Sequence, residues 1–460
     1  MNNFKNILNN IKNIHFIGIG GSGMCPIADV LFHKGFSISG SDNYISDTLQ
    51  RIIDKGITVF TEHNAQNVEH AELVVYSAAI KEDNVERIAA IKKGIPCLER
   101  SVMLGILCDE YPNTIAVAGT HGKTTTTAMI TQILTTAQKD PSAIIGGKLP
   151  YINGNSRCGN SDIIVCEACE YVDSFLQITP SIAVITNVES DHLDYFKNLE
   201  NVIKSFNKFA SKATNLIVVN GDDKNSILSV KNIDTNIITF GESKNNTYYA
   251  ENISEKNVAF PSFSLMKNGE KIIDIKLSVP GKYNIINAVA AAAVAHHLNV
   301  DPADIAKALY EFTGVHRRFE ILGSLNEITV ADDFAHHPTE ITSVLTAASK
   351  MGFNRVIAIF QPHTYSRTAA FLDEFAKALS IADVTILSEI LAVREVNTYN
   401  IKSEDLADKI KNCICLQTFE EITNCIEKIA KPGDLILTMG GGNVYVCANM
   451  IFDRLKNSLE

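Results

Sequence analysis

The residues with the clearest chemical potential lie in one glycine-rich stretch, Ala118–Thr126 (AGTHGKTTT), which follows an apolar run at Thr114–Ala118. In a turn between a strand and a helix, the free amides of the helix N-terminus cradle phosphate oxygens. Lys123 would place a cation on the β- and γ-phosphates, and the Thr124 hydroxyl could ligate Mg²⁺. The residues expected to bind ATP here are Gly119, Thr120, His121, Gly122, Lys123, Thr124 and Thr125.

This stretch departs from the strict phosphate-loop pattern G-x-x-x-x-G-K-[ST], because position 117 holds Val117 instead of glycine. An accidental G-K-T string without a ligand is the alternative interpretation. The apolar strand before it and the helical run after it supply the context that a phosphate loop requires. We therefore interpret it as a variant phosphate loop.

A second glycine-rich turn lies near the N-terminus, where Gly18–Met24 (GIGGSGM) follows the apolar run Asn13–Ile19. It satisfies G-x-G-x-x-G, and Asp42 follows the next predicted strand, where an acid can hold a ribose hydroxyl. A tight turn without a ligand is the alternative. The pattern predicts a phosphate-bearing ligand but does not distinguish NAD from another nucleotide.

Candidate metal ligands follow two further predicted strands. Glu167 comes directly after Ile163–Cys166, and Asn187, Asp191 and His192 follow Ile182–Ile185. Because parallel strands end at one edge of a sheet, these side chains should gather near the phosphate loop. Mg²⁺ prefers oxygen ligands, so His192 is either a ligand or a histidine that caps a helix or supports a ligand.

Bulk properties exclude several classes of protein. The 460 residues carry a formal net charge of -11, which argues against nonspecific nucleic-acid binding. No apolar stretch approaches the roughly 18 residues of a membrane span, and no secretory signal is evident, so we expect a cytoplasmic protein without membrane contact. The ten cysteines are then reduced thiols. Cys166 and Cys169 form one C-x-x-C pair, which we interpret as apolar filling and not as a zinc site.

Strand, turn and helix patterns alternate along the chain and predict an α/β fold with largely parallel sheets. Three domains are expected, over residues 1–107, 108–315 and 316–460. The stretch Ser243–Ser278 is typical of an antiparallel excursion, and Ala288–Ala295 predicts a buried helix. The other predicted strands are Phe36–Ser39, Leu73–Tyr76, Leu216–Val219, Arg355–Phe360, Val384–Leu387 and Leu435–Met439.

With these motifs in this order, the chain resembles the Mur ligase family over nearly its whole length. G-T-H-G-K-T-T is specific to that superfamily. The other matching stretches are His15–Met24, Gly40–Asp42, Val75–Ile80, Glu167–Glu170 (EACE), Thr186–Asp194 (TNVESDHLD), Gly281–Ala288, Gly314–Phe319 (GVHRRF), Asp332–Glu340 (DDFAHHPTE), Gln361–Thr368 (QPHTYSRT), Ser388–Glu395 and Met439–Val444.

The resemblance implies a Rossmann-like domain for a UDP-sugar, a central phosphate-loop ATPase domain and a Rossmann-like C-terminal domain that binds the amino acid. It implies that Thr124, Glu167 and His192 ligate a divalent metal. Arg317, His363 and Arg367 would join Lys123 and His192 at the reacting groups, and Asn284, Asn287 and Asp333 would contact ATP. The residues implied for the UDP-sugar are Gly18, Gly20, Gly21, Ser22, Gly23, Met24, Ser41, Asp42 and Ser77.

The implied activity is amide-bond formation driven by ATP, with Mg²⁺ or Mn²⁺ as cofactor, in peptidoglycan precursor synthesis. Two strings, Asp332–Glu340 and Gln361–Thr368, favour the branch that uses UDP-N-acetylmuramate and L-alanine. A ligase that attaches a recycled tripeptide to the same UDP-sugar is the alternative within the family. An NAD-dependent oxidoreductase and a nucleotide sensor without catalysis are the alternatives outside it. A monomer or homodimer is expected.

Overall fold

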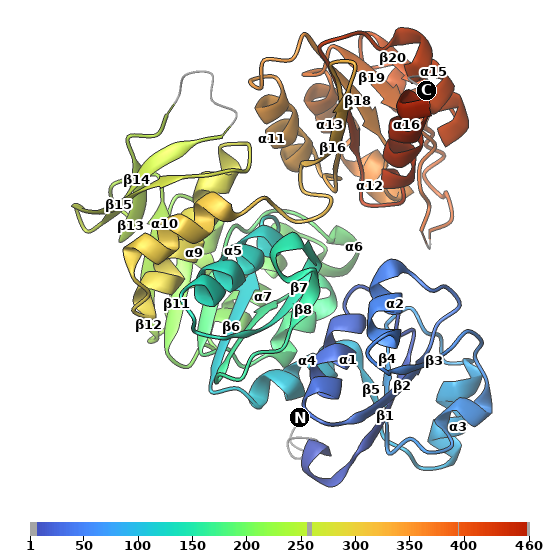
Figure 1. Ribbon diagram of the computed structural model, residues 1–460, viewed down its shortest axis with the longest axis vertical. Coiled ribbons are helices and arrows are strands. Elements are labelled where there is room, and N and C mark those ends of the chain that lie inside the picture. Colours follow the sequence, from blue (N-terminus) through green and yellow to red (C-terminus); the bar gives the residue numbers. More distant parts are fainter. Residues whose placement is uncertain (1–6, 255–259, 394, 458–460) are drawn as a thin grey trace. The chain divides into compact units, whose positions relative to one another are not determined.

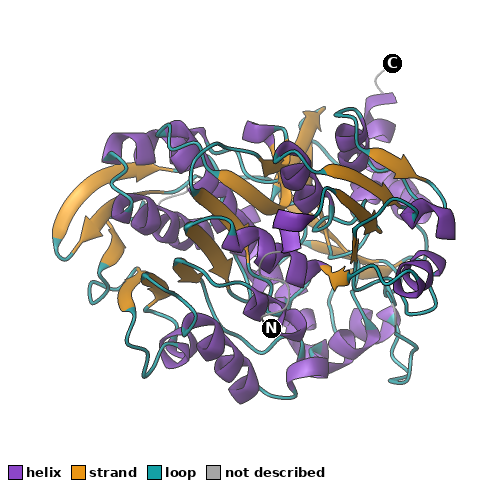
Figure 2. Ribbon diagram, turned by 90° about the horizontal axis from the view of Figure 1, so that it is seen from below, coloured by secondary structure: helices purple, strands orange, loops and turns teal. Residues whose placement is uncertain are grey.

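The structure, a computed structural model, describes residues 7–254, 260–393 and 395–457 of the chain (Figure 1). These residues form two compact units. The first unit comprises Met1–Glu251, Ser264–Ile273 and Ile286–Leu309, and the second comprises Asn252–Phe263, Asp274–Ile285 and Tyr310–Glu460. Helices pack against the strands of each unit (Figure 2). The predicted α/β class is confirmed, while the predicted boundaries at residues 107 and 315 stay a prediction.

The N-terminal region is built on a five-stranded parallel sheet in the order β3-β2-β1-β4-β5. That order places the switch in winding direction between β1 and β4, where doubly wound folds bind ligands. The strands are β1 Asn13–Ile17, β2 Ser37–Ser41, β3 Thr58–Phe60, β4 Leu73–Tyr76 and β5 Cys97–Glu99, and the helices are α1 Cys25–His33, α2 Asp47–Ile53, α3 Val85–Lys92 and α4 Arg100–Asp109.

One predicted boundary in this region is wrong. The first strand was expected to reach Ile19, but β1 ends at Ile17. Gly18 adopts a φ of 78°, a left-handed conformation that leaves the extended strand and that glycine reaches without steric cost. The glycine turn therefore begins at Gly18, directly after the last residue of the strand.

The central region has a ten-stranded sheet in the order β15-β14-β13-β12-β11-β10-β6-β9-β7-β8. Strand β6, between β10 and β9 in this order, is a mostly apolar run that is buried from its second residue onward, as a strand covered on both faces must be. The strands are β6 Asn113–Ala118, β7 Ser142–Leu149, β8 Gly154–Arg157, β9 Ile163–Glu167, β10 Ile182–Ile185, β11 Leu216–Asn220, β12 Asn236–Gly241, β13 Tyr248–Glu251, β14 Ser262–Lys267 and β15 Glu270–Lys276.

One helix and one strand pair of this region confirm two sequence predictions. The side chains of Ala288–Ala295 are buried in α9. The antiparallel excursion is confirmed where β13 pairs with β14, although residues 255–259 of the predicted stretch lie outside the described residues. The helices are α5 Lys123–Thr136, α6 Leu193–Phe196, α7 Leu199–Ala210, α8 Lys224–Ser229, α9 Tyr283–His297 and α10 Pro302–Glu311, with a short 3₁₀ segment, η4, at Tyr171–Gln177.

The C-terminal region has a six-stranded sheet in the order β16-β17-β21-β18-β19-β20, with only β16 antiparallel to its neighbour. The strands are β16 Glu320–Leu325, β17 Ile328–Asp333, β18 Arg355–Phe360, β19 Val384–Leu387, β20 Cys413–Cys415 and β21 Asp434–Met439. The helices are α11 Pro338–Ala348, α12 Tyr365–Ala370, α13 Leu372–Leu379, α14 Ser403–Ala407, α15 Phe419–Ile429 and α16 Tyr445–Asn457.

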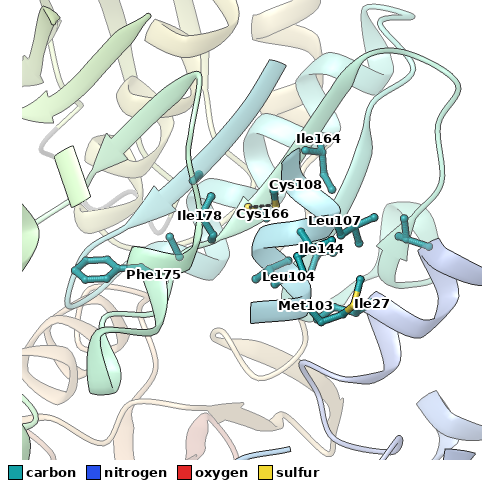
Figure 3. Close-up of a cluster of buried hydrophobic side chains, with 14 of the residues drawn as sticks. Ile27, Met103, Leu104, Leu107, Cys108, Ile144, Ile164, Cys166, Phe175 and Ile178 are labelled. Atoms are coloured by element: carbon teal, nitrogen blue, oxygen red, sulfur yellow. Dashed lines mark hydrogen bonds between the residues drawn. The ribbon is translucent and has the colours of Figure 1, made fainter. Parts of the chain in front are cut away.

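A continuous apolar core joins the N-terminal sheet to the central sheet within the first unit. Helix α4 contributes Met103, Leu104, Leu107 and Cys108 to a buried cluster that also contains side chains of α1, β7 and β9 (Figure 3). Within it, Cys166 is fully buried and its Sγ lies 3.7 Å from that of Cys108. Cys166 therefore fills apolar space, as predicted from the sequence.

Every helix in the described ranges is too short or too polar to cross a lipid bilayer.

Candidate active site

The site is built at the carboxyl edge of the central sheet, where β9 and β10 flank β6. Parallel strands of this kind present their following loops at a common edge. The glycine-rich turn after β6, Glu167 at the end of β9 and the segment after β10 therefore share one edge. The predicted gathering of these groups is confirmed by the strand order.

The turn after β6 needs its two glycines. Gly119 and Gly122 have φ values of 147° and 81°, in the left-handed range that side chains disfavour. A Cβ at Gly119 would also collide with the Thr186 hydroxyl. Helix α5 then begins at Lys123, and the amides of its first turn have no carbonyl partner inside the helix. The local geometry is that of a phosphate-binding helix start, despite Val117.

The segment after β10 braces this loop. Asn187 Oδ1 accepts from the His121 amide at 2.8 Å, and its Nδ2 donates to the His121 carbonyl at 3.0 Å. The Glu189 amide donates to Thr120 Oγ1 at 2.9 Å. Asn187 was predicted at this edge as part of a metal-binding group, and its amide instead fixes the loop backbone. The loop is thus held in its binding conformation by residues distant in sequence.

Lys123 is the cation of the site, and its ammonium faces back onto the loop. Nζ donates to the Gly119 carbonyl at 2.5 Å and the Thr120 carbonyl at 3.1 Å. The Glu170 carboxylate lies 3.0 Å away. Burial, the largest single effect, would lower the pKa of Lys123, but the charge and hydrogen bond of Glu170 together with the charges of Cys169 and Glu167 outweigh burial, so the pKa is raised. Lys123 is therefore charged at neutral pH inside a largely buried site.

The candidate metal ligands offer a hydroxyl, carboxylates and an imidazole. Glu167 Oε1 accepts from the Gly146 amide at 2.5 Å, and a Cβ at Gly146 would lie 2.6 Å from that oxygen. His192 begins α6 with a φ of 52°, and its ring does not cap the helix. Its Nε2 lies 4.0 Å from Glu170 Oε1. The capping alternative for His192 is therefore wrong.

These groups fit a divalent cation. Oxygen donors are the ligands that Mg²⁺ prefers, and an added imidazole also suits Mn²⁺. The buried Oε2 of Glu170 makes no hydrogen bond of normal geometry to any described residue, although Lys123 Nζ lies beside it. A buried carboxylate oxygen that lacks a hydrogen-bond donor is suited to a cation. Thr124, Glu167 and His192 would hold the metal, and Glu170 lies next to His192.

Asn287, one of the residues implied for ATP, lies beside the loop. Its Oδ1 accepts from Thr126 Oγ1 at 3.3 Å, and a Cβ at Gly122 would approach that oxygen to 2.5 Å. Asn284 belongs to the second unit, where its Nδ2 donates to the Pro280 carbonyl at 2.7 Å. Contact of either residue with the nucleotide stays a prediction.

Asp333, the third such residue, is buried in the second unit. Its carboxylate accepts from the amides of Phe319 and Ala335 at 2.7 Å and 2.6 Å. Burial raises the pKa of Asp333 to about 7, against the opposing effect of the Arg318 charge and these two amides. The carboxyl group therefore titrates near neutral pH.

The three residues implied for the reacting groups lie in the second unit. Arg317 Nε lies 3.0 Å from Asp332, and its Nη2 donates to the Gly440 carbonyl at 2.8 Å. Arg367 Nη1 lies 3.3 Å from His363 Nδ1. Arg317 thus ties the start of this region to the turn after β21, and the other two residues form a second pair.

In the N-terminal region, the residues implied for the UDP-sugar surround the start of α1. Gly18–Met24 form the turn between β1 and α1, while Ser41 ends β2 and Ser77 follows β4. The Gly20 amide donates to Asp42 Oδ2 at 2.9 Å, so the acid predicted for a ribose hydroxyl also ties β2 to the glycine turn. Their contact with a ligand stays a prediction.

The structure adds two charged residues that the sequence did not single out. Glu170 is the second acid of the E-A-C-E string, and only its partner Glu167 was given a role. Arg100, at the start of α4, lies against the glycine turn, because a Cβ at Gly23 would lie 3.1 Å from its Cδ. Burial raises the pKa of the Cys169 thiol, and the Arg100 charge opposes that shift. Arg100 thus lies against the glycine turn, and its charge acts on a thiol of the E-A-C-E string, a relation that no spacing in the sequence reveals.

Comparison with known proteins gives three family matches in chain order. Residues 13–112 match the Mur ligase family catalytic domain, residues 117–295 the Mur ligase middle domain, and residues 317–442 the Mur ligase glutamate ligase domain. The UDP-N-acetylmuramate–L-alanine ligase of Acetivibrio thermocellus is 45% identical over 449 residues, covering 96% of each chain. That of Caldanaerobacter subterraneus is 44% identical over 455 residues, covering 98% of this chain and 99% of its own.

Two solved structures are similar over almost the whole length. The crystal structure of UDP-N-acetylmuramate-alanine ligase MurC from Thermotoga maritima has a TM-score of 0.83 and 31% identity, covering 97% of this chain and 100% of its own. A murein peptide ligase from Psychrobacter arcticus has a TM-score of 0.75 and 27% identity, covering 97% and 99%.

Proposed function

Because the chain belongs to the Mur ligase family, we propose that it joins L-alanine to the carboxylate of UDP-N-acetylmuramate, with conversion of ATP to ADP and phosphate, in peptidoglycan precursor synthesis. The observation that carries this proposal is the edge of the central sheet, where a charged Lys123 at a phosphate-type helix start lies beside acids from the end of β9. That arrangement suits transfer of a phosphoryl group.

The chemistry explains why ATP is required. A carboxylate does not react with an amine in water, because its oxygen is a poor leaving group. Transfer of the γ-phosphoryl group to that oxygen gives an acyl phosphate. The neutral amine of L-alanine then attacks the carbonyl carbon, the tetrahedral intermediate collapses, and phosphate leaves. In phosphoryl transfer, a protein contributes mainly positioning and charge stabilisation.

The first unit would supply the nucleotide chemistry. Lys123 would hold the γ-phosphate, and the amides from Gly119 to Thr125 would hold the remaining phosphate oxygens. Thr124, Glu167 and His192 would hold Mg²⁺ or Mn²⁺, which when bound would neutralise the charge that develops during phosphoryl transfer. The glycine turn before α1 would bind the UDP-sugar, with Asp42 fixed by Gly20.

The second unit would bind the amino acid. Arg317, His363 and Arg367 would face the reacting groups, and Asn284 and Asp333 would contact ATP. Arg317 would supply a positive charge at a fixed position, because its guanidinium is held by Asp332 and by the Gly440 carbonyl. His363 would orient the substrate or accept the amine proton. We further propose that the enzyme acts in the cytoplasm as a monomer or homodimer.

A ligase that attaches a recycled tripeptide to the same UDP-sugar is the second candidate, favoured by the similarity to the Psychrobacter arcticus enzyme. Alanine addition is preferred because the relatives that bear that activity in their names reach 46% identity. The oxidoreductase alternative loses its support, because the glycine turn on which it rested lies inside the ligase match at residues 13–112.

The deciding experiment measures ADP release by the purified full chain. With ATP and Mg²⁺ present, we expect release to require both UDP-N-acetylmuramate and L-alanine, with mass spectrometry showing the alanylated product. Replacing L-alanine by the tripeptide L-alanyl-γ-D-glutamyl-meso-diaminopimelate should abolish most of the release. Faster turnover with the tripeptide would transfer the assignment to the second candidate, and release independent of the UDP-sugar would refute both.

A further inference from the structure

Every N–H donor of the Lys123 ammonium already has an acceptor within the first unit. An ammonium has three donors. Two meet the carbonyls of Gly119 and Thr120, and the third meets Glu170, whose Oε1 and Oε2 lie 3.2 Å and 3.0 Å from Nζ. A phosphate can therefore accept a hydrogen bond from Lys123 only if one of these acceptors loses its own hydrogen bond to the ammonium.

Glu170 is the acceptor that can be displaced. The two carbonyls belong to a loop that Asn187 and Glu189 hold in place, so they cannot retreat from the ammonium. The Glu170 side chain is 2% exposed, and its Oε2 makes no hydrogen bond of normal geometry among the described residues. Glu167, in contrast, is bound by the Gly146 amide.

The backbone next to Glu170 is fixed. Val172 and Asp173 adopt φ values of 48° and 59°, which non-glycine residues rarely occupy, and a β-branched residue least of all. Asp173 is held there by the Ser205 hydroxyl and by the Tyr195 hydroxyl, the latter at 2.8 Å. The carboxylate can therefore change partners by rotating its side chain, without movement of the chain.

The alternative partner of Glu170 would be the metal cation, because a candidate ligand of that cation lies next to Glu170. Glu170 Oε1 is 4.0 Å from His192 Nε2, a nitrogen that the proposed function assigns to the metal. If a phosphate took Lys123 without a cation, Glu170 would be left buried, charged and next to that phosphate. Such uncompensated buried charge is strongly unfavourable. A divalent cation delivered with the nucleotide would remove that penalty.

We propose that Glu170 is an exchangeable counterion of Lys123, which occupies the lysine in the free enzyme and turns to the nucleotide-bound cation, so that the site rejects metal-free nucleotide. This inference rests on the proposed function, because it needs the loop to bind ATP. It makes Glu170 a positioning residue. No bond is made or broken in this exchange.

The test measures binding and not turnover. The dissociation constant of a fluorescent N-methylanthraniloyl ATP analogue is determined for the full chain with excess Mg²⁺ and with EDTA, and the ratio of the two constants gives the metal preference. In Glu170→Gln, we expect metal-free binding to tighten by about tenfold or more, because a like charge a few ångströms away is removed. The metal preference should fall by at least the same factor.

Two variants serve as matched controls, since each also removes one negative charge. Glu167→Gln should reduce the metal preference by weakening the binding of the Mg²⁺ complex, with little tightening of metal-free binding. Glu200→Gln, whose side chain is 74% exposed and pairs with Lys204 at 2.7 Å, should leave both constants unchanged. Glu170 alone should therefore change the metal-free constant.

The outcomes separate this inference from the proposed function. Wild-type protein that binds no nucleotide under either condition would overturn both. Wild-type protein with a clear metal preference, combined with unchanged or weaker metal-free binding in Glu170→Gln, would overturn only the exchange. If Glu170→Gln does not fold, Glu170→Asp replaces it, because the shorter side chain withdraws the charge from Lys123. An unchanged ratio in folded Glu170→Asp would also overturn the exchange.

Discussion

Two glutamates of the first unit, Glu86 and Glu170, are both almost completely buried, yet they have very different partners. Glu86, on α3, is surrounded by polar side chains that contact both of its carboxylate oxygens. Its Oε2 accepts from Ser41 Oγ at 2.6 Å and lies 2.8 Å from His63 Nδ1, while Oε1 accepts from Asn67 Nδ2 at 2.6 Å. Both oxygens are satisfied by neighbours in the same region.

Glu170 pairs with Lys123 and lies 4.0 Å from His192 Nε2, and one of its oxygens makes no hydrogen bond among the described residues. A fully satisfied buried carboxylate rigidifies its surroundings, whereas an incompletely satisfied one is costly unless something else compensates it. The comparison indicates that Glu86 stabilises the fold, connecting α3 to the end of β2. Glu170 instead keeps one oxygen that is available to a ligand.

The pKa of Glu86 supports this difference. Burial alone would raise it, but the surrounding hydrogen-bonding side chains lower the pKa to about 2. His15 Nε2 lies 3.6 Å from Oε1, too far for a normal hydrogen bond, so its contribution is mainly electrostatic. The region therefore strongly favours the ionised form of Glu86.

The largest expected effect tests the functional side of the comparison. Lys123→Ala should lower kcat by about three orders of magnitude or more, because a charge that stabilises phosphoryl transfer is lost. The fold should remain intact but less stable, because Asn187 and Glu189 still hold the loop while buried Glu170 loses its ionic partner. Steady-state ADP release and circular dichroism check this. Near-normal turnover in folded Lys123→Ala protein would contradict the assignment of the loop.

The second-largest expected effect tests whether Glu86 stabilises the fold. Glu86→Ala should lower the free energy of unfolding by about 3–4 kcal/mol, because it leaves buried polar partners without an acceptor. Urea unfolding followed by circular dichroism measures this. Glu86→Gln, which keeps one acceptor oxygen, should cost less, and the KM for ATP should stay unchanged in both variants. A stability loss below about 1 kcal/mol in Glu86→Ala would place Glu86 among ordinary surface acids.

The smallest expected effect is the pH dependence of the same contribution. The folded pKa of Glu86, about 2, lies below the ordinary glutamate value of 4.5, so the unfolded chain takes up the proton first as the pH falls. The contribution should be complete above pH 4.5 and disappear as the pH falls towards 2, amounting at most to about 3 kcal/mol. We expect the stability difference between wild type and Glu86→Gln to shrink across this window. A difference that is constant with pH would show that the charge contributes nothing.

Local patterns in the sequence predicted much of the fold. The apolar run before Gly119 gave β6, and the two glycines of the loop predicted the turn that starts α5. Short-range rules suffice there, because backbone freedom at glycine and burial of a continuous apolar strand depend on neighbouring residues alone. The strand end at Ile17 was missed for a related reason, because apolar Ile19 continues the pattern across the turn.

The sequence predicted which residue types form the candidate site, but not which of these residues contact one another. Glu167 was expected at the end of a core strand and lies there as the last residue of β9. That Gly146 binds it, and that Asn187 braces His121, could not be deduced. Those contacts depend on which strands neighbour β6 and β9, and crossover connections of similar length allow several orders.

The sequence by itself determined the glycine turns, the core strands and the presence of a lysine at the start of α5, because each depends on the local backbone or on apolar periodicity. Only the tertiary structure decided that Lys123 meets Glu170 and that Glu86 meets Ser41. These pairs are 47 and 45 residues apart in the chain, and sheet order, not spacing, brings their side chains together.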